Sequence, residues 1–176
     1  QRVFTIVPCS YPTDSPEWND RGEGPGAPAA THLPNSPVIQ TGKREGSKIR
    51  LPNGNYLENT ANHFVILMGK SPSTALISMK ATQLKISRKW NSIMMGIKLQ
   101  GKTGLFTPPT YSHIYNLKTV QMSNDKGTWF GWEVSKVGPV EDQGVYGIAK
   151  SFAEQVGKGD VQVKHGSDES KTDSPY

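Results

Sequence analysis

The sequence has one cysteine, no long hydrophobic run, and a central stretch of 66 residues without a single acidic side chain. One cysteine, Cys9, excludes an intramolecular disulfide framework and any zinc site built on several cysteines. No apolar run approaches the roughly 18 residues of a membrane-spanning helix, and no signal-peptide pattern opens the chain, so no membrane contact is expected. Hydrophobic residues make up only 34% of the 176 residues, whereas glycine and proline supply 18 and 13 positions. This composition argues against a helical bundle and favours a loop-rich, mainly β protein.

The charges are segregated along the chain. Residues 59–124 contain eight lysines and arginines and no Asp or Glu, whereas residues 141–176 contain four basic and seven acidic side chains. Solvated surfaces normally mix both signs, because like charges repel. Together with the net charge of +5, the acid-free stretch predicts a surface that binds a polyanion. The alternative is that acids from elsewhere in the fold balance it.

The hydrophobic pattern predicts the secondary structure. Period-two runs predict strands at 2–8, 56–68, 74–79, 111–120 and 128–134, with a further short strand at 48–51. Helical spacing of apolar residues predicts helices at 84–97 and 142–156. Turn residues at 69–73 and 123–127 predict two hairpin connections.

Three strands, a helix and two strands is the chain order of an OB-fold, a small Greek-key barrel that binds oligonucleotides. We therefore predict a mainly β (α+β) protein, an OB-fold-like five-stranded barrel with a helix between strands 3 and 4, plus a C-terminal helix. A generic α+β sheet has the same chain order. The predicted OB-like domain spans residues 1–165, with a long Pro/Gly-rich loop at about 10–45 and a flexible acidic tail at 166–176.

Single-stranded nucleic acid is held by cations that follow the phosphates and by aromatic rings on which bases stack. The predicted phosphate contacts are basic residues of the acid-free stretch, namely Lys80, Lys85, Arg88, Lys89 and Lys118. The alternative is an ordinary solvated helix face, although such faces usually interleave acids.

The predicted stacking platform comes from the two strands that follow. Alternation along 111–120 places Tyr111, His113 and Tyr115 on one face, with Trp129 contributed by the neighbouring strand. The alternative is that the tyrosines cover the end of a barrel. Arg50 and Tyr56, on either side of the turn at 52–55, complete the predicted binding set. Three further aromatic residues are assigned to the core: Trp90, Phe130 and Trp132.

Sequence patterns of enzymes are absent. The chain has no phosphate-binding loop, no dinucleotide-binding glycine fingerprint and no metalloprotease or hydrolase motif. The four histidines lack the spacing of metal ligands, and the carboxylates cluster in the predicted loop and tail. We therefore expect no catalysis, no cofactor and no metal.

Four segments between residues 75 and 156 read ALISMKATQLKISRKWNSIM, GLFTPPTYSHIYNLKTV, SNDKGTWFGWEVS and AKSFAEQV. They resemble a family of small proteins encoded by tailed bacteriophages and common in marine viral sequences, and the stretch that they span covers roughly half of the chain. The resemblance implies a virus-encoded protein in the host cell cytoplasm, with a role in phage DNA metabolism as a single-stranded DNA-binding protein. It does not extend to residues 10–45 or to the tail.

The predicted function is thus that of a phage single-stranded DNA-binding protein in replication or recombination, with sequence-tolerant and salt-dependent binding. The acidic tail resembles the C-terminal tips with which such proteins recruit replication or recombination partners, and a homo-oligomer is left open. One alternative is a virion structural protein, a capsid or tail component that uses the Pro/Gly-rich loop at about 10–45 for subunit contacts. Another is an accessory recombination protein that binds a protein partner first.

Overall fold

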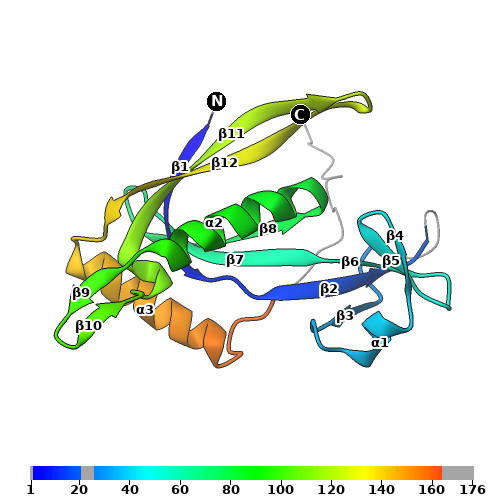
Figure 1. Ribbon diagram of the computed structural model, residues 1–176, viewed down its shortest axis with the longest axis horizontal. Helices are drawn as coiled ribbons and strands as arrows, with labels where there is room; N and C mark the ends of the chain where they lie inside the picture. The colour runs from blue at the N-terminus through cyan, green and yellow to red at the C-terminus, as the bar shows by residue number, and fades with distance from the viewer. Residues whose placement is uncertain (1, 21–25, 164–176) are drawn as a thin grey trace, which may run out of the picture. The chain divides into compact units, whose positions relative to one another are not determined.

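The computed structural model describes residues 2–20 and 26–163. The protein is mainly β with three α-helices, and its chain divides into two compact units (Figure 1). Unit 1 comprises residues 1–12 and 61–162, and unit 2 comprises residues 13–60 with the chain from 163 onward. The predicted tail at 166–176 lies outside the described residues.

Unit 1 is built on a sheet with the strand order β8-β7-β1-β11-β12. Its strands are β1 (Val3–Ser10), β7 (Thr60–Leu67), β8 (Ser73–Lys80), β11 (His113–Asn124) and β12 (Gly127–Pro139). The central strand β1 pairs antiparallel with β7 on one side and with β11 on the other. The β11–β12 hairpin turns where predicted, at Gly127 with φ 138°, a conformation that residues with a side chain rarely adopt.

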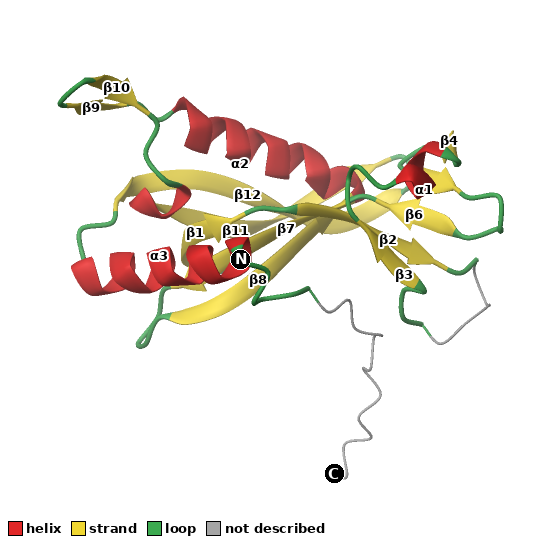
Figure 2. Cartoon of the chain, turned by 90° about the horizontal axis from the view of Figure 1, so that it is seen from below, coloured by secondary structure: helices red, strands yellow, loops and turns green. Residues whose placement is uncertain are grey.

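A helix covers each face of this sheet (Figure 2). The two helices are α2 (Leu84–Gly96) and α3 (Gln143–Gly157), close to the predicted bounds. Because neighbouring residues of a strand point to opposite faces, Val65 packs in the core with α2, whereas the Phe64 ring lies 6.0 Å from that of Phe152 in α3. The N-terminus of α3 is capped by Asp142, whose carboxylate accepts hydrogen bonds from two backbone N–H groups at 2.8 and 3.0 Å.

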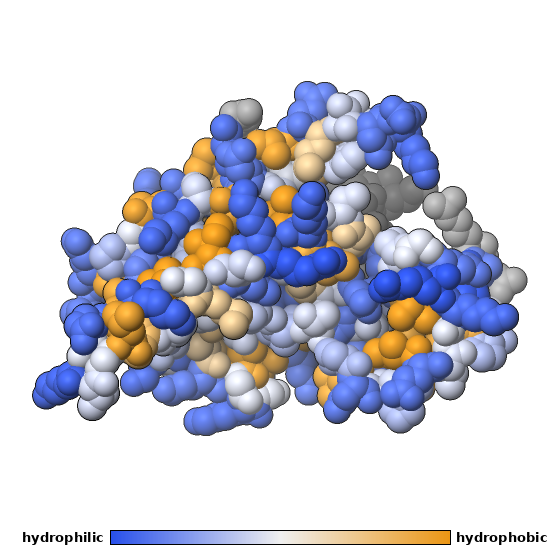
Figure 3. All heavy atoms as spheres, in the orientation of Figure 1, coloured by the Kyte–Doolittle hydropathy of each residue, from blue (hydrophilic) through white to orange (hydrophobic). Residues whose placement is uncertain are grey.

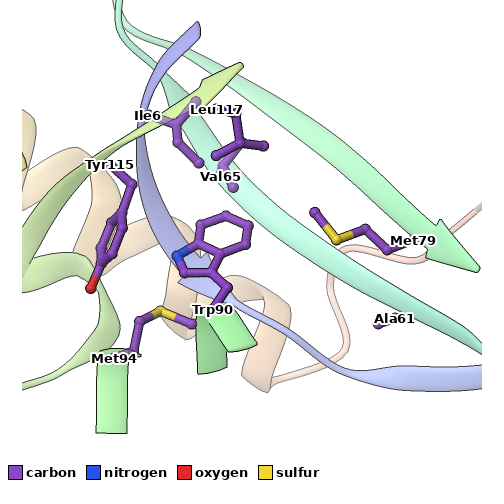
Figure 4. Packing of buried hydrophobic residues seen from close by; sticks show 8 residues of the cluster. All are labelled: Ile6, Ala61, Val65, Met79, Trp90, Met94, Tyr115 and Leu117. Atoms are coloured by element: carbon purple, nitrogen blue, oxygen red, sulfur yellow. The ribbon is translucent and has the colours of Figure 1, made fainter. Parts of the chain in front are cut away.

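The core of unit 1 lies between the sheet and α2 (Figure 4). Trp90 and Met94 point from α2 toward Val65 and Leu117, and the prediction that Trp90 lies in the core is confirmed. The Trp90 ring stacks on His63 with the ring centroids 4.4 Å apart. Burial lowers the pKa of His63 to about 4, because the interior disfavours the charged imidazolium.

The sheet of unit 1 curls but does not close into a barrel. Among the described residues, its outer strands β8 and β12 pair only with β7 and β11. The short 3-10 turn η1 (Ala81–Gln83) reaches the edge of β12 instead, where the Gln83 side-chain oxygen accepts a hydrogen bond from the Trp132 backbone N–H at 3.2 Å. The predicted OB-fold-like five-stranded barrel is therefore not confirmed, and the strands form an open, curled half-barrel.

Unit 2 has the strand order β3-β2-β6-β5-β4 and a short helix α1 (Pro37–Gln40). Its strands are β2 (Thr13–Trp18), β3 (Ala30–His32), β4 (Lys43–Glu45), β5 (Lys48–Arg50) and β6 (Tyr56–Glu58). Much of the predicted loop at about 10–45 is thus folded. Strand β2 was not predicted from the sequence because its buried positions include Asp14, Ser15 and Glu17, which are polar and so give no alternating hydrophobic pattern. Side-chain hydrogen bonds hold it instead, such as the one that Ser15 donates to Asn59 at 2.8 Å.

A separate two-stranded hairpin projects from unit 1 (Figure 2). It consists of β9 (Leu99–Gly101) and β10 (Gly104–Phe106) and lies between α2 and the 3-10 turn η2 (Thr110–Ser112) in the chain. We call residues 98–107 the arm.

Candidate nucleic-acid interface

The two units differ in charge. Unit 1 contains thirteen lysines and arginines against six acidic residues, whereas unit 2 contains seven against nine. The three ion pairs that the structure shows among the described residues all lie in unit 2. The cations of unit 1 therefore dominate its electrostatic field, so an anion site is expected there.

The cations of α2 lie on one exposed face. Helical spacing places Lys85, Arg88 and Lys89 on the side opposite Trp90 and Met94, which are buried. Figure 3 shows strongly hydrophilic side chains on the surface over α2. Three of the predicted phosphate contacts are thus brought together on a rigid element.

This face is electrostatically unfavourable for the helix itself. Lys85 and Lys89 are a like-charge pair at i and i+4, and such a pair destabilises a helix by about 0.2–0.5 kcal/mol. The first turn contains no acidic residue and the N-cap makes no side-chain hydrogen bond, so cations stand where the helix dipole favours anions. A bound anion would relieve both costs.

A cavity of about 240 Å³ opens beside the start of α2. It is lined by η1 and by the tip of the β11–β12 hairpin, with Thr82, Asn124, Lys126 and Trp129 among its residues. The indole N–H of Trp129 is buried and has no hydrogen-bond partner in the described part of the protein. The cavity thus combines an aromatic ring and a cation, close in the chain to Lys85.

A second aromatic group lies on the inner side of the half-barrel. The rings of Phe4 and Trp132 meet edge to face at 5.9 Å and line an apolar cavity of about 180 Å³. Two residues before Trp132, Phe130 is 73% exposed, so the expectation that it belongs to the core is wrong. The reason is that β12 extends beyond the last core residue, so its inward face emerges into solvent near the hairpin tip.

The predicted Tyr-His-Tyr platform does not form an exposed face. Tyr115 is fully buried against Trp90, and burial raises its pKa to about 12. His113 is also buried, its ring nitrogen 2.7 Å from the Ser112 hydroxyl, and desolvation and the nearby Lys136 lower its pKa. Tyr111 lies in η2 before the strand begins, and its ring contacts that of Tyr146 in α3 at 5.2 Å. The face that alternation identified is the core face of β11.

The two remaining predicted phosphate contacts lie on strands. Lys80 is exposed at the end of β8, immediately before η1. Lys118 is half-buried on β11 with Glu133 directly opposite it on β12. Opposite charges directly across a strand pair attract each other, although these two side chains form no ion pair among the described residues.

Arg50 and Tyr56 belong to unit 2, where other groups of that unit already engage them. The Arg50 guanidinium forms ion pairs with Asp20 at 3.3 Å and Glu45 at 3.2 Å, and hydrogen bonds to Glu45 and Asp20 raise its pKa. The Tyr56 ring is covered by the Lys48 ammonium, 3.8 Å from its centroid. The contact of Lys48 with Tyr56 joins β5 to β6, whereas the Arg50 ion pairs join β5 to β4 and to the segment after β2.

A polar cluster in unit 2 was not predicted from the sequence. Glu17 is buried in β2, where its carboxylate accepts hydrogen bonds from Asn53 at 3.0 Å and Asn55 at 2.6 Å and pairs with His32 Nε2 at 2.8 Å. The bonds from Asn55 and His32 lower the pKa of Glu17. Each carboxylate oxygen has a partner, which is typical of a structural clasp. A sequence sign of it was the pair of asparagines in the turn at 52–55.

Within residues 2–20 and 26–163, no group of three or more His, Cys, Asp or Glu side chains is placed to hold a metal ion. The lone Cys9 is buried, and desolvation raises the pKa of its thiol to about 12. No helix in the same ranges is long and apolar enough to cross a membrane.

A family model described as Pam3 phage gp34-like protein matches residues 1–162. No curated protein and no solved structure matches the chain.

Proposed function

We propose, from the premise that the chain belongs to the Pam3 phage gp34-like family, that it is a phage protein that binds single-stranded DNA in the infected host cell. Binding would use the cationic face of α2 and the cavity beside its start, without a cofactor. The protein would act in replication or recombination, where single strands are exposed.

The observation that carries this proposal is the uncompensated cationic face of α2. Lys85, Arg88 and Lys89 are exposed and make no ion pair in the described ranges. They lie on a helix that contains no acidic residue. A DNA backbone supplies anions in a row and releases its own counterions as the lysines and arginines neutralise it. The sequence tolerates an unfavourable helix because the face serves a ligand.

Aromatic residues near this face favour a single strand over a duplex. Trp129 lines the cavity beside α2, and the exposed Phe130 ring follows it in the chain on the other side of the strand. Stacking on such rings requires unpaired base faces and contributes roughly 1–3 kcal/mol per base. In this proposal these two residues replace the tyrosines that sequence alternation suggested.

Fluorescence anisotropy with labelled oligonucleotides tests the proposal. We expect tighter binding to a single strand than to a duplex of the same length, and weaker binding to both at higher salt. Equal affinity for the two would exclude stacking as the basis of recognition. No binding to either at low salt would exclude the function.

A virion structural protein is the second candidate, and the projecting arm favours it. The arm exposes large apolar side chains, which subunit contacts in an assembled particle would cover. Mass spectrometry of purified particles separates the two. A structural component would be present at many copies per particle, whereas a protein of DNA metabolism would be absent or present in traces.

A further inference from the structure

The arm exposes three large apolar side chains to solvent. Leu99, Leu105 and Phe106 are 40%, 70% and 47% exposed. Directly opposed residues share a face, so Leu99 and Phe106 lie on one side of the hairpin and Leu105 on the other. Figure 3 shows hydrophobic atoms at the surface of this region.

An isolated two-stranded hairpin is marginally stable in water. The arm forms its own two-stranded sheet, and both Figures 1 and 2 show it standing away from the sheet of unit 1. Within the hairpin, the Phe106 ring lies over Gly101, where an added Cβ would approach it to 3.1 Å, and Lys98 donates a hydrogen bond to Thr107. These contacts shape the arm but leave its apolar faces uncovered.

Unit 1 also carries a mostly apolar groove that is large enough for an apolar side chain of the arm. A mostly apolar cavity of about 500 Å³ lies between α3 and the start of β8, lined among others by Thr74, Gly147, Ile148 and Phe152. Ile148 is 46% exposed at this groove. A cavity of about 150 Å³ holds a benzene ring, so this one has room for a leucine side chain.

The charges that flank the two surfaces are opposite in net sign. The arm carries Lys98 and Lys102 and belongs to the stretch without acidic residues. The segment around α3, residues 141–160, carries four acidic residues against two lysines, and all six lie outside the groove lining. Opposite potentials guide two such surfaces together and fix their orientation.

We propose that the arm of one copy docks into the α3 groove of a second copy, with Leu105 as the anchoring side chain. The two surfaces are different patches of one chain, so the contact is head to tail. Each copy then keeps one free arm and one free groove, and the chains form a closed ring or an open filament. The contact needs no nucleic acid, so its test is separate from that of DNA binding.

The test is the mass in solution by size-exclusion chromatography with light scattering, without DNA. Leu105→Asp removes an anchor at an exposed position, and Thr103→Asp places the same charge at the turn as its control. Gly147→Trp fills the groove, because an added Cβ there meets nothing within 4 Å, and Gly147→Ala is its control. We expect oligomers for the wild type and both controls, and monomers for Leu105→Asp and Gly147→Trp.

Mixing the two monomeric variants decides the geometry. The Leu105→Asp protein keeps an intact groove and the Gly147→Trp protein keeps an intact arm, so a mixture should form dimers and nothing larger. A wild type that stays at the 19.3 kDa monomer mass, a mixture that stays monomeric, or an oligomer that survives Gly147→Trp would each overturn the proposal. Circular dichroism of every variant confirms that it is folded before its mass is interpreted.

Discussion

Reversing one charge on α2 should stabilise the protein and weaken its binding to DNA. Lys85 is exposed in the first turn of the helix, four residues before Lys89. The substitution Lys85→Glu removes a like-charge pair and creates an attractive one in the favourable order, each about 0.2–0.5 kcal/mol. It also places an anion at the positive end of the helix dipole, which contributes about 0.3–1 kcal/mol. Together these effects raise the free energy of unfolding by about 1 kcal/mol at low salt.

Urea unfolding measures the first effect and anisotropy with a single-stranded oligonucleotide the second. A gain of about 1 kcal/mol moves the urea midpoint upward by roughly 0.5 M with an unchanged slope, and the gain should shrink at high salt. Lys85→Gln, which removes the charge without reversing it, should fall between the wild type and Lys85→Glu in both assays. Lys150→Glu on α3 is the matched reversal elsewhere in unit 1, and it should leave DNA binding nearly unchanged beyond the effect of net charge.

Two results would refute the reasoning in different places. A Lys85→Glu protein that is no more stable than the wild type at low salt would show that the helix is not electrostatically strained. A protein that is more stable but binds DNA as tightly as the wild type would show that α2 lies outside the site.

Further outcomes follow from individual side chains. Trp129→Ala should weaken single-strand binding by about 1–3 kcal/mol, whereas Trp129→Phe should keep part of it; equal binding by all three proteins in anisotropy titrations would remove this ring from the site. The folded-state pKa of His63 lies below its unfolded value, so its contribution to stability is complete above pH 6.5 and is lost as the pH falls toward 4, by about 3 kcal/mol; chemical denaturation should show this fall, and a flat profile would contradict the buried neutral ring. Glu17→Gln disrupts its contact with His32 and should cost about 1–3 kcal/mol, seen as faster hydrogen exchange in β2 and β3; unchanged exchange there would exclude the clasp.

The helices and the five sheet strands of unit 1 could be read from the sequence because burial there is largely hydrophobic, whereas the exposed hairpin of β9 and β10 was not predicted. The spacing of Trp90 and Met94 fixed which side of α2 faces the sheet, and therefore which side presents Lys85 and Arg88. Unit 2 could not be read in this way. In β2 the buried carboxylate of Glu17 takes its partners from two separate segments, and only the folded chain brings them together.

The aromatic part of the candidate site was misjudged for a related reason. Strand alternation tells which residues share a face, but it does not tell which face is covered. Tyr115 and Phe130 were assigned to the surface and to the core, and the structure places them the other way round. The deciding facts are that α2 packs on the face of Tyr115 and that β12 extends past the core at Phe130.

The salt dependence of single-strand affinity tests the central claim most directly. Two double variants remove the same charge from unit 1: Arg88→Ala with Lys89→Ala on α2, and Lys150→Ala with Lys158→Ala on and just after α3, where both lysines are exposed. If α2 holds the phosphates, the first variant should flatten the slope of log K against log salt by about 0.7 per lost contact, and the second should leave the slope of the wild type. An unchanged slope in a folded α2 variant, or an equal loss in both, would contradict the account.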